Sequence, residues 1–110
     1  MAKDALIIVD VQNDFCPGGA LAVRDGDQVV AALNGVSAAF EKAGLPVVAT
    51  RDWHPGRTSH FKAYGGIWPS HCVQGTHGAE FHPDLVLGKD AVVDPRGNEV
   101  ADAVRRQPIA

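Results

Sequence analysis

Four side chains of types that commonly bind metal ions lie within twenty residues of one another: Asp52, His54, His60 and His71. Asp52 and His54 are two positions apart, so they project to one face if the apolar run 45–50 is a strand that continues through them. Imidazole and carboxylate ligands together suit zinc, iron or manganese better than calcium or a soft thiolate site. A single histidine is more often an ordinary polar loop residue, but the set of four predicts a divalent transition-metal centre.

A second carboxylate, Asp10, follows the apolar run 5–9, just as Asp52 follows the run 45–50. In open parallel sheets, ligands bind beyond the carboxyl ends of the strands, so we expect both carboxylates to face one crevice. An aspartate at the end of a strand can instead cap a loop by accepting backbone N–H bonds. The neighbouring metal motif favours a role for Asp10 in the site over a role in capping the loop.

The elements that position these residues alternate between strand and helix. The run 5–9 is continuous, apolar and β-branched, which is typical of a central strand covered on both faces of a parallel sheet. A crossover helix is predicted next, with Asp27 as its N-cap and Gly44 as the glycine that ends it. Its apolar residues recur at helical spacing: Val29, Leu33, Val36 and Phe40.

The run 45–50 predicts a second strand, which completes a right-handed βαβ unit. Turn residues in 12–28 predict a long loop, and 51–83 is rich in Gly, Pro and His and has the character of a functional insertion. A short third strand is expected at 91–93, and 99–106 has weak helical character. Three strands are few for a doubly wound sheet, which usually has about five or more, so the fold is expected to be incomplete.

Composition narrows the class of protein. At 110 residues the chain is expected to form one domain. Its net charge of −3 comes from interspersed charges without a basic stripe, so we do not expect nucleic acid as a partner. No signal peptide or membrane span is evident, so we expect a cytoplasmic protein without a membrane partner. The two cysteines, Cys16 and Cys72, do not form a disulfide framework, and a reducing compartment would keep them as thiols.

Four long motifs cover much of the chain: 8–23 (IVDVQNDFCPGGALAV), 50–55 (TRDWHP), 68–76 (WPSHCVQGT) and 78–83 (GAEFHP). Together they resemble the nicotinamidases of the isochorismatase-like cysteine hydrolases. The resemblance covers nearly all of residues 4–85. It implies an α/β fold, a three-layer parallel sheet with flanking helices, six strands in the sheet, and a bound zinc or iron. It also implies hydrolysis of nicotinamide to nicotinate and ammonia, a step of NAD salvage.

The resemblance also implies roles for individual residues. In the family a cysteine attacks the amide, an aspartate takes its proton and a nearby lysine tunes both groups. Aromatic walls that stack on a pyridine ring contribute roughly 0.5–1.5 kcal/mol beyond area burial, although such residues can equally be plain core packing. By position, Asp52, His54, His60 and His71 resemble the metal ligands, Asp10 the catalytic aspartate, and Phe15 and Trp68 the aromatic walls.

The sequence departs from the family pattern after residue 85. Where the family has Lys-Gly, this chain has Arg96-Gly97, and Lys89 is the only lysine nearby. Arginine is fixed in its protonation state, so it is a poor substitute for a tuned lysine. By the resemblance, the nucleophilic cysteine belongs to a C-terminal half that this sequence does not contain. We therefore expect residues 1–93 to be the N-terminal part of the hydrolase domain and 94–110 a divergent tail, as a frameshift or a partial gene would produce.

Three functions remain open on the sequence. The first is a nicotinamidase-family amidohydrolase with a nicotinamide-like small-molecule substrate, whose catalytic set is incomplete in this chain. The second is a short metallohydrolase that uses a metal-bound water with Asp10 as base, and so needs no cysteine. The third is a non-enzymatic, metal-binding fragment or subunit that associates with itself or with another chain through an open sheet edge. Cys16 and Cys72 are expected to be packing residues rather than reactive thiols in each case.

Overall fold

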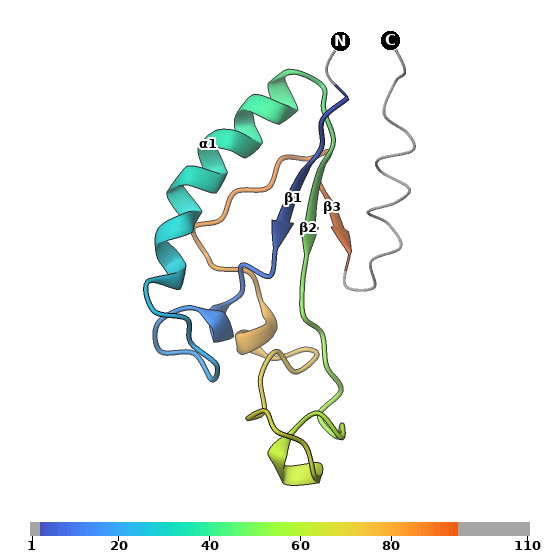
Figure 1. Cartoon of the computed structure of the whole chain (residues 1–110). Coiled ribbons are helices and arrows are strands. Elements are labelled where there is room, and N and C mark those ends of the chain that lie inside the picture. The colour runs from blue at the N-terminus through green and yellow to red at the C-terminus, as the bar shows by residue number, and fades with distance from the viewer. Residues whose placement is uncertain (1–2, 95–110) are drawn as a thin grey trace.

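The computed structural model describes residues 3–94 of the chain. In this range three strands and one α-helix form an α/β unit (Figure 1). The strands are β1 (Leu6–Val9), β2 (Val47–Thr50) and β3 (Val92–Asp94), and the helix is α1 (Val29–Lys42). Four short 3-10 helices lie in the connections: η1 (Asn13–Phe15), η2 (Gly26–Gln28), η3 (Lys62–Tyr64) and η4 (His77–Ala79).

The strands form one parallel sheet in the order β1-β2-β3. β1 pairs with β2 from Leu6 opposite Val47 onward, and β2 pairs with β3 from Val48 opposite Val92 onward. Because both neighbours of β2 run parallel to it, each needs a crossover connection, and α1 supplies the first. The predicted parallel sheet with a crossover helix is therefore confirmed, with each strand within about two residues of its expected bounds, as such boundaries allow.

The strand expected at the centre of the sheet is instead at its edge. β1 has only β2 as a neighbour in the described sheet, and β2 takes the central position. Ile8 on β1 is 1% exposed, whereas Ile7 is 46% and Val9 is 65% exposed. Successive strand residues point to opposite faces, so one face of β1 is packed and the other is open. The prediction that β1 is covered on both faces is wrong for the described chain.

The core lies between the sheet and α1. Its buried residues come from β1, the turn after it, α1 and β2, and they are Ile8, Val11, Val30, Val47 and Ala49. Partly buried apolar side chains of the helix and of the segment that leads into β3 pack around them, Leu33, Phe40, Leu85 and Leu87 among these. Burial of this apolar surface fixes the sheet against the helix, at roughly 25 cal/mol per Å².

The helix starts later than predicted. Asp27 is not its N-cap, because it lies inside η2, and the residue before α1 is Gln28, whose side chain makes no capping hydrogen bond. The buried stripe is also rotated from the expected one. Val30 and Ser37 are buried, while Val29 and Val36 are nearly half exposed. The apolar pattern did not predict this rotation, because a polar residue, Ser37, occupies one of the buried positions of the helix.

The end of α1 agrees with the prediction. Gly44 has a φ of +71°, which is the left-handed conformation that glycine adopts without steric cost. The Leu45 N–H donates to the Phe40 carbonyl at 2.9 Å, and the Gly44 N–H donates to the Glu41 carbonyl at 3.0 Å. These two bonds form a Schellman motif, which ends the helix and turns the chain into β2.

Residues 51–83 form a lobe beyond the carboxyl ends of β1 and β2 (Figure 1). The lobe is held by isolated bridges, His54 with Val73 and Phe61 with Trp68, rather than by regular strands. The predicted functional insertion therefore has a defined structure. No helix in residues 3–94 is long and apolar enough to cross a membrane. The helix expected at 99–106 lies outside the described residues.

Candidate metal centre

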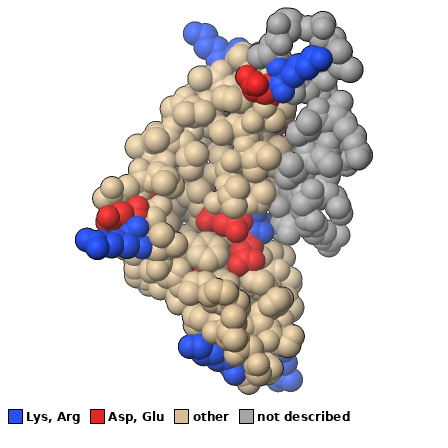
Figure 2. Space-filling view, in the orientation of Figure 1, with Lys and Arg blue, Asp and Glu red and all other residues tan. Residues whose placement is uncertain are grey.

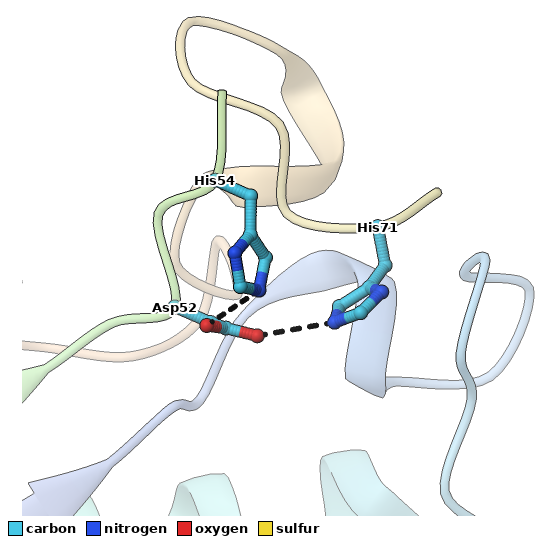
Figure 3. A group of neighbouring side chains, drawn as sticks. All are labelled: Asp52, His54 and His71. Atoms are coloured by element: carbon cyan, nitrogen blue, oxygen red, sulfur yellow. Dashed lines mark hydrogen bonds and ion pairs between the residues drawn. The ribbon is translucent and has the colours of Figure 1, made fainter. Parts of the chain in front are cut away.

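The Asp52 carboxylate lies between two imidazoles (Figure 3). Its Oδ1 is 2.9 Å from Nε2 of His54, and its Oδ2 is 3.2 Å from Nε2 of His71. One ligand atom from each of these three residues lies within 4.8 Å of the others, which is close enough to share a metal ion. The tertiary structure thus brings together three of the four residues that the sequence nominated.

A different local feature of the backbone is associated with each of the three residues. Asp52 follows β2 by two residues. His54 is held by the segment after His71, because the His54 N–H donates to the Cys72 carbonyl at 2.9 Å. His71 precedes Cys72, whose φ of +48° is in the left-handed region that non-glycine residues rarely adopt. The left-handed turn thus lies directly after His71, whose ring is in contact with Asp52.

Both ring nitrogens of His71 have an oxygen within hydrogen-bond distance. Its Nδ1 lies 2.7 Å from the Pro69 carbonyl, which can only accept, so Nδ1 carries the proton. Its Nε2 is the ring nitrogen that faces the Asp52 carboxylate, 3.2 Å from Oδ2. A metal ion shared with Asp52 would bind His71 at this nitrogen. A backbone carbonyl that fixes the tautomer of a histidine in this way is typical of metal sites, and the residues present fit a divalent ion.

Phe61 supports both imidazoles from behind. It is fully buried, and its ring lies 5.4 Å from the His54 ring in a T-shaped arrangement and 5.4 Å from the His71 ring. An apolar backing restricts ring orientation and lowers the local dielectric constant. The sequence analysis missed this residue.

His60 lies beside the three-residue group rather than within it. Its ring centroid is 5.5 Å from that of His54, its side chain is exposed, and it lines the same cavity. Its assignment as a fourth ligand is not tested by this arrangement and stays a prediction.

The group formed by Asp52, His54 and His71 opens into a cavity of about 340 Å³. Phe15 and Trp68, the predicted aromatic walls, both line it, and Leu21 adds an apolar side chain that the sequence analysis did not single out. The remaining lining residues are Asp52, His54, His60 and His71. This volume is in the range of small-molecule sites, which are mainly apolar with a few polar groups that fix orientation.

Asp10 lies at the carboxyl end of β1 but is not among the residues that line the cavity. Its Oδ1 accepts a hydrogen bond from the Thr50 hydroxyl at 2.9 Å, and its backbone has a φ of +54°. The carboxylate is thus tied to the end of β2. Its catalytic role stays a prediction.

Both cysteines are buried, and their thiols are poor nucleophiles. Burial is the main reason that the pKa of the Cys72 thiol is raised to about 12. Three carboxylates raise it further: Asp52, Asp14 and Asp10. Burial, and then the charge of Asp27, also raise the pKa of the Cys16 thiol. Because the thiolate is the reactive form, both residues agree with the packing role predicted for them.

Acidic side chains form a patch near the middle of one face, with some basic atoms at its edge, and other basic side chains on that face lie toward its periphery (Figure 2). A concentration of carboxylates attracts cations and repels anions.

Two further residues that the sequence analysis missed bind backbone groups near the site. Gln12 bonds to the backbone of Asp52, and the Asp14 carboxylate accepts the Cys72 N–H. Both belong to the motif 8–23, so their signal was present in the sequence. Their contacts connect residues 40 and 58 positions apart, which sequence spacing cannot reveal.

Comparisons with known proteins agree on one family. The family model described as an isochorismatase domain matches residues 4–103, and so extends past the boundary expected at residue 93. The nicotinamidase/pyrazinamidase of Mycobacterium tuberculosis is 52% identical over 85 residues, which cover 74% of this chain and 45% of that protein. The nicotinamidase of Escherichia coli is 38% identical over 119 residues, which cover 94% of this chain and 56% of that protein.

A solved structure agrees as well. The pyrazinamidase of Pyrococcus horikoshii in complex with zinc superposes with a TM-score of 0.84 at 41% identity, covering 94% of this chain and 64% of that one. The matched residues of this chain span about half the length of the two curated relatives.

Proposed function

Because the chain belongs to the isochorismatase family, with an α/β fold that is incomplete relative to its relatives, we propose that it carries the metal-binding and ring-binding part of a nicotinamidase. The proposed reaction of the whole domain is hydrolysis of nicotinamide to nicotinate and ammonia. The similarity to two curated nicotinamidases supports this substrate class. Residues 1–93 are proposed as the N-terminal part of that domain and 94–110 as a divergent tail.

One observation carries the proposal: a carboxylate between two imidazoles opens into a cavity walled by aromatic rings. Two neutral imidazoles and one carboxylate leave a divalent ion with a net positive charge and with open positions, which is typical of catalytic rather than structural sites. We propose Asp52, His54, His60 and His71 as its ligands. The zinc complex of the Pyrococcus horikoshii relative supports zinc, and the ligand types suit iron and manganese as well.

The chain's own residues account for recognition of a flat heteroaromatic ring. Phe15 and Trp68 both line the cavity and are proposed to stack on such a ring, with Leu21 as a further apolar contact. Trp68 is 46% exposed, so a bound ring would cover an aromatic surface that now faces solvent. A bound metal would supply a positive centre that orients the ligand.

The alternative of a short metallohydrolase with Asp10 as base is less well supported. A general base must come within hydrogen-bond reach of the proton it takes. The Asp10 carboxylate is bonded to Thr50, and Asp10 does not line the cavity. In the proposed nicotinamidase, Asp10 is the residue that takes the proton of a cysteine. Because both cysteines in the described chain are buried, that cysteine is proposed to lie in the part of the relatives that this chain does not match.

Ligand binding tests the proposal directly. The zinc-loaded chain is titrated with nicotinamide and, in parallel, with benzamide, which has the same shape but lacks the ring nitrogen. We expect nicotinamide to bind more tightly than benzamide, and Trp68→Ala to weaken both because the stacking surface is lost. Equal affinity for the two amides would contradict a metal-oriented pyridine ring, and unchanged affinity in Trp68→Ala would contradict the aromatic wall.

A further inference from the structure

The side chain of Gln12 is fully buried and makes three hydrogen bonds to backbone groups of two distant segments. Its Oε1 accepts the Asp52 N–H at 2.8 Å, and its Nε2 donates to the Asp52 carbonyl at 2.8 Å. The same Nε2 donates to the Ala79 carbonyl, also at 2.8 Å. One side-chain amide thus satisfies both backbone groups of a proposed metal ligand.

These bonds replace a rung of the sheet. The Asp10 N–H donates to the Thr50 carbonyl at 3.2 Å, which continues the parallel ladder of β1 and β2. In a parallel ladder the Asp10 carbonyl would next accept the Asp52 N–H. The chain turns away at Asp10, however, and its carbonyl accepts the Gln12 N–H at 2.9 Å instead. The Gln12 side chain then supplies the missing acceptor.

The third bond connects this rung to the other side of the site. Ala79 belongs to η4 and is fully buried, and the backbone of Gln12 also bridges Phe81. Ala79 lies eight residues after His71 in the sequence. Gln12 therefore connects the backbone of Asp52 to the segment that follows His71, and a change in its length or hydrogen bonding would alter the separation of these two segments.

We propose that Gln12 is a positioning residue, which fixes the backbone of Asp52 so that its carboxylate meets both imidazoles. The inference rests on the metal site of the proposed function. Gln12 does not line the cavity, so it acts through Asp52 rather than on a ligand. Outer residues that orient metal ligands typically change metal affinity about 10- to 100-fold when they are replaced.

Two substitutions test it in the full chain. Gln12→Met keeps the length of the side chain and removes all three bonds, whereas Gln12→Asn keeps the amide but shortens its reach by one methylene. The chain offers a matched control in Asn34, whose amide likewise pairs with loop backbone away from the site. Its Nδ2 donates to the Asp84 carbonyl and its Oδ1 accepts the Val86 N–H, both at 2.8 Å.

Zinc affinity is measured by competition with a chelator, and the stability of each metal-free chain by thermal unfolding. We expect both Gln12 variants to bind zinc about 10- to 100-fold more weakly and Asn34→Leu to bind it like the wild type. Wild-type zinc affinity in Gln12→Met or Gln12→Asn would overturn the inference, as would an equal loss in Asn34→Leu. If Gln12→Met does not fold, Gln12→Asn decides.

A readout without metal separates this inference from the proposed function. Amide hydrogen exchange at Asp52 is expected to speed up in Gln12→Asn and not in Asn34→Leu, because only the former loses the acceptor of that N–H. If the wild-type chain binds no zinc, the metal-binding proposal fails, and exchange at Asp52 still decides the role of Gln12. Unchanged exchange at Asp52 would overturn it.

Discussion

The Asp14 carboxylate accepts the backbone N–H of Cys72 at 2.7 Å, across 58 positions of sequence. Its other oxygen accepts the Ala20 N–H at 3.1 Å. Asp14 thus fastens the loop after β1 to the strained residue that follows His71. A charge-assisted bond to a backbone N–H is stronger than a neutral one, and here it stabilises a left-handed conformation that a cysteine adopts only at a cost.

Alanine substitutions at two glycines are expected to change stability in opposite directions, because one glycine packs against Asp14 and the other has open space around it. A Cβ at Gly78 would overlap the Asp14 carboxylate, so we expect Gly78→Ala to lower the free energy of unfolding by about 1–3 kcal/mol and to weaken metal binding. Gly35, within α1, has open space around it, and Gly35→Ala should stabilise the chain by about 0.4–1 kcal/mol. Urea unfolding measures both, and stabilisation by Gly78→Ala would contradict the packing.

Metal binding is expected to need the paired imidazoles. The purified chain should contain one zinc or iron, and the double variant His54→Ala, His71→Ala should contain none, because only one strong ligand of the three-residue group remains. The control is His77→Ala, since the His77 side chain is 84% exposed and pairs with Glu80 on the surface. Elemental analysis compares the three proteins. Equal metal content in the wild type and the double variant would refute the site.

The 110-residue chain is expected to hydrolyse nicotinamide negligibly, even with metal bound. A catalytic set that lacks its nucleophile loses about as much rate as one that lacks all its members. Ammonia release is measured for the wild type and for Asp10→Ala, Cys16→Ala and Cys72→Ala. Robust turnover that depends on Asp10 and on either cysteine would show that the short chain has a working site of its own.

The Cys72 thiol should resist alkylation in the native chain at pH 8. Its folded pKa is about 12, against an ordinary value of 9.0, so the thiolate is scarce until the pH is strongly alkaline. The fold favours the neutral thiol, and this stabilisation is complete below pH 9.0 and is lost as the pH rises toward 12. Labelling with iodoacetamide, with and without denaturant, measures the effect. Rapid native labelling of Cys72 at pH 8 would contradict it.

Self-association through β1 is expected, because one face of this edge strand is open and apolar. Ile7 and Val9 are 46% and 65% exposed there. Replacing both with threonine keeps the β-propensity but reduces the apolar surface, so it should shift the chain toward the monomer. Val86→Thr is the control, since Val86 is 64% exposed but lies outside the strands. Sedimentation velocity compares the variants, and an unchanged distribution would exclude this face as the contact.

The sequence by itself determined the parallel α/β class, the strands near 5–9 and 45–50, and the glycine that ends the helix. Each depends on local chemistry: β-branched runs favour strands, and only glycine adopts a φ of +71° freely at Gly44. It also nominated Asp52, His54 and His71 as neighbours, because their types and spacing suit one metal ion.

Only the tertiary structure decided how those residues are held and which strand lies at the edge. An apolar run cannot show how many neighbours it has, so β1 was expected at the centre although β2 occupies it. The buried face of α1 was also mispredicted, because it includes the polar residue Ser37. Gln12, Asp14 and Phe61 support the site through contacts that depend on where the loops meet in space, which no periodicity in the sequence encodes.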